Sequence, residues 1–71
     1  MIQTLTVNGD ARKYGLDDFP HTVAELVASL ALDPAMVVAE VNGDIIRREQ
    51  FASHALNDGD AIELVRFVGG G

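Results

Sequence analysis

The fold of this chain is decided by residues 22–30, Thr22-Val-Ala-Glu-Leu-Val-Ala-Ser-Leu30, which carry its one strong helical pattern. Apolar side chains recur there at i, i+3, i+4 and i+7, and they form one stripe that requires a sheet to cover it. The stripe consists of Val23, Leu26, Val27 and Leu30. Thr22 and Glu25 fit the S/T-x-x-E capping box, so the helix is expected to begin at Thr22. Asp33-Pro34 predicts its end, because the residue before proline disfavours helical geometry.

The segment before the helix predicts a β-hairpin. Residues 1–8 alternate, with Leu5 and Val7 on one face, as in a half-buried strand. Asn8-Gly9-Asp10 follows, and Asn and Gly tolerate the positive φ angles of tight hairpin turns. A second strand, over about residues 11–16, is therefore expected to pair antiparallel with the first. Residues 17–21 then predict a loop.

The segment after the helix repeats this pattern. Residues 37–41 predict a strand in which Ala39 and Val41 share a face. Asn42-Gly43-Asp44 repeats the first turn signal and precedes a short strand at residues 45–46. We interpret the two Asn-Gly-Asp segments as turn chemistry alone.

The remaining elements complete a two-layer domain. Residues 47–56 predict a turn of helix and a loop around Phe51, and residues 57–60 predict a turn before a last strand at about 61–68. This order predicts an α+β domain with the β-grasp fold: a mixed four- to five-stranded sheet with one main helix across one face. We expect residues 1–68 to form the domain, with the final strand placed centrally beside the first.

Composition excludes several classes of function. The 71 residues suffice for one domain, and with no cysteine there is no disulfide, thiolate ligand or catalytic thiol. The net charge of −6 argues against nucleic acid and anionic membranes as partners. His21 and His54 alone make a poor metal-ligand set, so no metal site is expected. The N-terminus lacks the features of a signal peptide, which predicts a cytoplasmic location.

The sequence finishes with three glycines, Gly69, Gly70 and Gly71. Glycine contributes no side-chain packing and loses the most backbone entropy on ordering, so we expect residues 69–71 to be a flexible tail. A tail without side chains can enter a narrow channel on another protein and present its last carbonyl carbon for chemistry. The alternative interpretation is that chain ends simply tolerate glycine.

Five segments carry a resemblance to a known family. They are Thr22–Leu26, Val41–Gly43, Ile46–Phe51, Asn57–Asp60 and Phe67–Gly71. In this order and spacing, they make the chain similar to the ThiS family of sulfur carriers in thiamine biosynthesis. That family belongs to the ubiquitin-like β-grasp superfamily and is related to the MoaD family. Two positions depart from its pattern: Arg47 stands where the family often has proline, and Phe51 where it often has tryptophan.

The resemblance implies a reactant and not an enzyme. An E1-like adenylating enzyme, similar to ThiF, would use ATP to adenylate the carboxylate of Gly71. Sulfur from the persulfide of a cysteine desulfurase system would displace AMP and leave a thiocarboxylate. A thiazole synthase, similar to ThiG, would receive that sulfur. ATP and the persulfide belong to the partner enzymes, so no bound cofactor is expected, and Gly69 and Gly70 would thread into the partners' active sites.

Strand parity predicts which side chains dock the partners. Ile62 and Leu64 should face the helix, whereas Val65 and Phe67 should lie on the opposite face just before the tail. An exposed aromatic residue there is typical of an interface anchor. We therefore expect Val65, Phe67 and Val68 to contact the partners, and the free protein to be a monomer.

Three alternatives remain open at this stage. A sulfur carrier for molybdopterin or another pathway would share the fold and the Gly-Gly end. A non-reactive β-grasp binding module would have an inert tail. Conjugation to lysines, as in ubiquitin, is the third alternative. The Arg48-Glu49-Gln50-Phe51 segment favours the thiamine carrier, by resemblance only.

Overall fold

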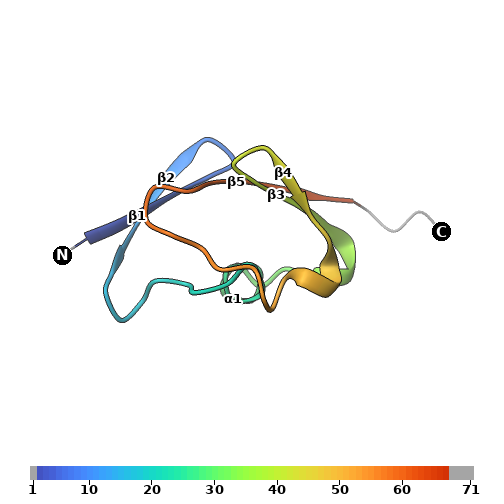
Figure 1. The fold of residues 1–71 in the computed structure, drawn as a ribbon, viewed down its shortest axis with the longest axis horizontal. Helices are drawn as coiled ribbons and strands as arrows, with labels where there is room; N and C mark the ends of the chain where they lie inside the picture. The colour runs from blue at the N-terminus through green and yellow to red at the C-terminus, as the bar shows by residue number, and fades with distance from the viewer. Residues whose placement is uncertain (1, 68–71) are drawn as a thin grey trace.

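The computed structural model of the chain describes residues 2–67, which form a five-stranded sheet and one α-helix (Figure 1). The strands are β1 (Ile2–Val7), β2 (Asp10–Gly15), β3 (Val37–Val41), β4 (Asp44–Ile46) and β5 (Ala61–Arg66). The helices are α1 (Val23–Ser29) and two short 3-10 helices, η1 (Pro34–Met36) and η2 (Arg48–Gln50). None of the helices in this part of the chain is long and apolar enough to cross a membrane.

The sheet is mixed, with the strand order β2-β1-β5-β3-β4. β1 and β5 run parallel, and the other neighbouring pairs are antiparallel. Helix α1 lies across one face of this sheet (Figure 1). The arrangement confirms the predicted α+β, β-grasp fold and the central position of the last strand.

The core lies between α1 and the sheet face that it covers. Val23, Leu26 and Val27 of the helical stripe are almost fully buried, as the spacing predicts. They pack with the buried side chains of β1, β3, β4 and β5 and with the aromatic ring of Phe51, and Tyr14 of β2 packs against this core from its edge. Phe51 is 3% exposed, so its ring is part of the core.

Both Asn-Gly segments form the predicted hairpin turns. Asn8 and Gly9 have φ angles of 51° and 84°, and Asn42 and Gly43 have φ angles of 52° and 88°. Two successive residues with positive φ define a turn whose twist matches that of the flanking strands. Each turn therefore fixes the register of its hairpin.

The C-terminal end of α1 differs from the prediction. Helix α1 stops at Ser29, before Asp33-Pro34, because Ala31 adopts a left-handed conformation with φ 58°. The N–H groups of Ala31 and Leu32 donate to the carbonyls of Ala28 and Val27, at 3.0 and 3.1 Å. This is the Schellman pattern, which usually places glycine where Ala31 stands. Asp33 instead caps η1 by accepting the Ala35 N–H at 2.9 Å.

The start of α1 is confirmed with one change. Thr22 is the N-cap, and its hydroxyl accepts the Glu25 N–H at 3.2 Å. The carboxylate of Glu25 reaches the N–H of His21, at 3.1 Å, one residue before the N-cap. The reciprocal half of the expected capping box is thus displaced by one residue, and both interactions still satisfy N–H groups at the helix start.

Candidate functional site: the end of β5 and the outer face of the sheet

The sheet face opposite α1, here called the outer face, carries a cluster of exposed apolar side chains. This outer apolar patch consists of Val38, Ile45, Val65 and Phe67, which are 42%, 68%, 60% and 46% exposed. Val38 and Val65 are directly opposite each other in the β3–β5 pair. Exposed apolar side chains that gather in this way are typical of interaction surfaces.

Side-chain alternation along β5 agrees with the predicted parity. Ile62 and Leu64 are buried, and Val65 and Phe67 are exposed. The geometry therefore brings together two of the three residues predicted to dock partners, whereas the docking role itself stays a prediction. Val68, together with Gly69, Gly70 and Gly71, lies outside the described residues.

The backbone holds β5 as far as Phe67. The Phe67 N–H donates to the carbonyl of Met36 at 3.0 Å, one step beyond the last paired residues, Arg66 and Val37. The chain therefore leaves the sheet beside the first residue of β3. Phe67, the residue next to this exit, is also a member of the outer apolar patch.

Two asparagine side chains fasten β5 from both sides. The side-chain oxygen of Asn8, at the end of β1, accepts the Leu64 N–H at 2.7 Å. The side-chain oxygen of Asn42, at the end of β3, accepts the Ala61 N–H at 2.9 Å, and its amide donates to Asp60 at 2.9 Å. The interpretation of the Asn-Gly-Asp segments as turn chemistry alone is therefore wrong. Each asparagine both forms a turn and bonds to the strand that precedes the tail.

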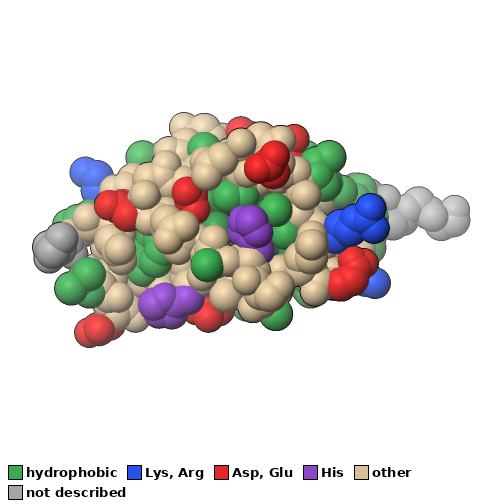
Figure 2. All heavy atoms as spheres, viewed as in Figure 1, with side chains coloured by type: hydrophobic (Ala, Val, Ile, Leu, Met, Phe, Trp, Pro, Cys, Tyr) green, Lys and Arg blue, Asp and Glu red, His purple; other side chains and the backbone are tan. Residues whose placement is uncertain are grey.

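Acidic side chains in the turn before β5 also bond to the backbone. Asp58 accepts the Thr4 N–H at 2.7 Å, and Asp60 accepts the Asn57 N–H at 2.8 Å. Within residues 2–67, no group of three potential metal ligands gathers. The histidine side chains lie apart from each other in Figure 2. These carboxylates therefore act as structural hydrogen-bond acceptors.

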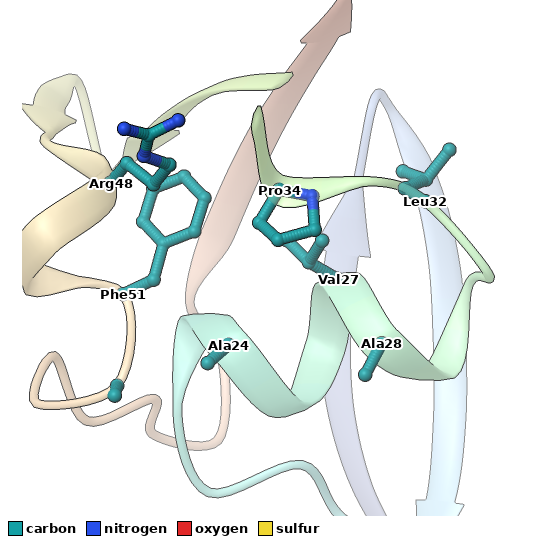
Figure 3. Close-up of a pocket in the computed structure, with 8 residues that line it drawn as sticks. Ala24, Val27, Ala28, Leu32, Pro34, Arg48 and Phe51 are labelled. Carbon is teal, nitrogen blue, oxygen red and sulfur yellow. The ribbon is translucent and has the colours of Figure 1, made fainter. Parts of the chain in front are cut away.

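A second surface feature, an apolar pocket of about 270 Å³, lies between α1, η1 and η2 (Figure 3). Its lining comprises Ala24, Val27, Ala28, Leu32, Pro34, Arg48, Phe51 and Ala52. Arg48 is the only charged residue among them, and no other polar side chain joins it. Ligand sites usually combine an apolar lining with several convergent polar groups. The outer face beside the end of β5 is therefore the better candidate for function.

The surface charge is unevenly distributed. In Figure 2, the Asp and Glu side chains spread over the visible face, whereas Lys and Arg lie toward the two ends of the long axis. With eleven acidic and five basic residues, the body presents a negative field to an approaching protein. A partner with a basic docking surface would be favoured by this field.

Comparison with known proteins gives the family. The model of the ThiS family matches residues 5–71. The sulfur carrier protein ThiS of Bacillus subtilis is 40% identical over 67 residues, which cover 94% of this chain and 98% of that protein. The chain belongs to the ThiS family.

Two further relatives extend this result. A crystal structure of the thiamine biosynthesis protein ThiS from Geobacter metallireducens has a TM-score of 0.73 and 37% identity, covering 96% of this chain and 99% of that one. A thiazole synthase of Paramagnetospirillum magneticum is 37% identical over 67 residues, 94% of this chain. The chain spans only 20% of the length of that relative.

Proposed function

Because the chain is a member of the ThiS family, we propose that it is a sulfur carrier of thiamine biosynthesis and acts as a co-substrate, not as a catalyst. The observation that carries the proposal is the position of the outer apolar patch. Val65 and Phe67 are exposed beside the point where β5 ends, a few residues before the terminal glycines. A partner that covers this patch receives the tail at the same time.

The proposed chemistry takes place at Gly71. Its carboxylate is ionised at neutral pH and attacks the α-phosphorus of ATP in an E1-like enzyme, which forms the acyl adenylate and releases pyrophosphate. A persulfide sulfur from a cysteine desulfurase system then attacks the acyl carbon, and AMP leaves. Cleavage of the resulting S–S bond by a thiol reductant gives the thiocarboxylate. The absence of side chains at Gly69 and Gly70 leaves room for this approach in a narrow channel.

Docking would use Val65, Phe67 and Val68. An exposed aromatic ring flanked by aliphatic side chains loses water on contact, and each 100 Å² of apolar area buried contributes roughly 2.5 kcal/mol before association costs. The carboxylate-rich body would add long-range attraction to a basic partner. We expect the adenylating enzyme and the acceptor to use this same face in turn.

A thiazole synthase is the proposed sulfur acceptor. Support comes from the Paramagnetospirillum relative, a protein named thiazole synthase that contains a segment similar to this chain. A carrier-like segment joined to a synthase in one polypeptide supports a physical encounter of the two as separate chains. A molybdopterin carrier would instead co-purify with the large subunit of molybdopterin synthase.

Intact-mass analysis tests the proposal. The protein is incubated with ATP, an E1-like activating enzyme of the thiamine pathway and a persulfide source, and its mass is measured. Exchange of one oxygen for sulfur is expected in the wild type and not in a variant that lacks Gly71. An unchanged wild-type mass, with an activating enzyme shown to charge its own carrier, would favour an inert binding module. An isopeptide-linked ladder would instead indicate conjugation.

A further inference from the structure

Two carboxylates lie directly opposite each other on the outer face. Glu40 of β3 and Glu63 of β5 are directly opposite in the antiparallel register. The neighbouring pair on the same face is Val38 and Val65, and Ile45 of β4 lies opposite Glu40 on its other side. The glutamate pair therefore borders the outer apolar patch.

The pair is unfavourable for the isolated protein. Directly opposite side chains have Cβ atoms about 4.5–5.5 Å apart, and like charges at that separation destabilise a sheet. Within residues 2–67, neither carboxylate makes an ion pair with lysine or arginine. Neither glutamate side chain accepts a hydrogen bond from this part of the chain, in contrast to Asp58 and Asp60. The contacts among residues 2–67 therefore assign no structural role to these two acids.

We propose that Glu40 and Glu63 together bind the guanidinium group of one arginine on the thiazole synthase that docks on the outer apolar patch. This inference rests on the proposed function. A guanidinium presents five N–H donors in a planar fork and can donate to two carboxylates at once. A lysine ammonium is a compact, strongly hydrated charge and matches two separated acceptors less well.

The surroundings strengthen this choice. When a partner covers Val38, Ile45 and Val65, water leaves the neighbourhood of the carboxylates, and charge-assisted hydrogen bonds in such a place are stronger than at an open surface. If the partner offered no cation, the same loss of water would leave two charged carboxylates buried without a counter-charge. This free-energy penalty would weaken binding of such a partner. The pair would thus select among proteins that offer an apolar surface to the patch.

The test uses Glu40→Gln and Glu63→Gln, with Glu49→Gln in η2 as the control that removes the same charge away from the outer face. Gln keeps the size of the side chain and removes its charge. Each outer-face variant is expected to raise the Tm of the free protein by about 1–5 °C, because it relieves the like-charge pair. Each is also expected to weaken binding to thiazole synthase by about 10-fold or more in low salt, measured by calorimetry.

Two further readouts separate this idea from a change in net charge. The double variant should lose less affinity than the product of the two single losses, because both acids bind one group. Glu49→Gln should change the affinity by less than about 2-fold. Equal losses in all three variants, or unchanged affinity in Glu40→Gln and Glu63→Gln, would overturn the assignment.

Failure of the proposed function is distinguishable from failure of this inference. If the wild type acquires sulfur and binds thiazole synthase, yet Glu63→Gln binds equally well, the carrier function stands and the glutamate pair is wrong. If the outer-face variants lose only their charging by the adenylating enzyme, the arginine does not belong to the synthase, which also overturns the proposal. A wild type that never acquires sulfur removes the function on which the inference rests.

Discussion

Replacement of Asn8 by glycine is the sharpest test of how β5 is held. Asn8 has a φ angle of 51°, a conformation that glycine adopts without strain, so Asn8→Gly should preserve the turn. What the substitution removes is the side-chain oxygen that accepts the Leu64 N–H at 2.7 Å. The change therefore isolates one contact between the first hairpin and the strand before the tail.

The expected loss of stability follows from two contributions. A hydrogen bond of this kind contributes about 0.5–1.5 kcal/mol net. Glycine adds conformational freedom to the unfolded chain, which costs a further 0.4–1 kcal/mol, approximately. The free energy of unfolding should therefore fall by about 1.5 kcal/mol. For a domain of this size, that corresponds to a decrease in Tm of about 6–12 °C.

Thermal denaturation measures the loss of overall stability, and amide hydrogen exchange measures the loss of the bond to the Leu64 N–H. The Leu64 amide should lose protection by more than the global destabilisation accounts for, since its acceptor is gone. Asn8→Asp is the matched control, because aspartate keeps an acceptor oxygen and tolerates positive φ. If Leu64 exchanges no faster in Asn8→Gly than in Asn8→Asp, the side-chain bond does not hold β5 and the reasoning fails.

Three further predictions address the helix end, the core and the docking surface. Ala31→Gly should raise the free energy of unfolding, measured by urea denaturation, by about 1 kcal/mol, because glycine adopts a φ of 58° without the steric penalty of a Cβ. A loss of stability would contradict the left-handed conformation of Ala31. Phe51→Ala should cost about 3–5 kcal/mol in the same assay, and a cost below about 1 kcal/mol would show that the ring does not fill the core. Phe67→Ser should slow charging by the adenylating enzyme at least 10-fold, with a Tm within a few degrees of wild type. Leu16→Ser is the control, at an exposed apolar residue outside the outer apolar patch, and should be charged at the wild-type rate. Equal charging rates for the two variants would exclude Phe67 from docking.

Local patterns in the sequence were sufficient for most of the fold. The stripe at Val23, Leu26 and Val27 identifies a helix with one buried face, and the two Asn-Gly pairs identify hairpins because few residues tolerate consecutive positive φ angles. Alternation along residues 61–67 correctly separated the buried from the exposed side chains of β5. Each of these inferences depends on residues close together in the chain.

Features that depend on distant contacts were not accessible in the same way. The bond from Leu64 to Asn8 joins residues 56 positions apart, and the bond from Ala61 to Asn42 spans 19. The opposition of Glu40 and Glu63 requires the β3–β5 register, which no turn between adjacent strands specifies. The end of α1 was misplaced because Ala31 takes the left-handed position that glycine usually marks. Both hairpin turns begin with asparagine, at Asn8 and Asn42. This repeated choice of asparagine over aspartate was the one sequence signal for the side-chain bonds to β5.

The firm attachment of β5 limits the distance at which a docked partner could reach the carboxyl group of Gly71. Phe67 is held by its bond to Met36, and Asn8 and Asn42 fix the strand before it, so the end of β5 is held firmly beside the outer apolar patch. Gly71 lies four residues beyond Phe67 in the sequence, and a fully extended chain spans at most about 3.6 Å per residue, or roughly 14 Å over these four steps. Under the proposed function, a partner that covers the outer apolar patch would therefore have its reaction centre within about 14 Å of the Phe67 backbone. Under the same proposal, docking would make delivery of the carboxyl group effectively intramolecular, with the high local concentration that a short tether provides. A β5 that frayed at Leu64 would lengthen the tether and dilute this effect, which is why the two asparagine bonds bear on function as well as on stability.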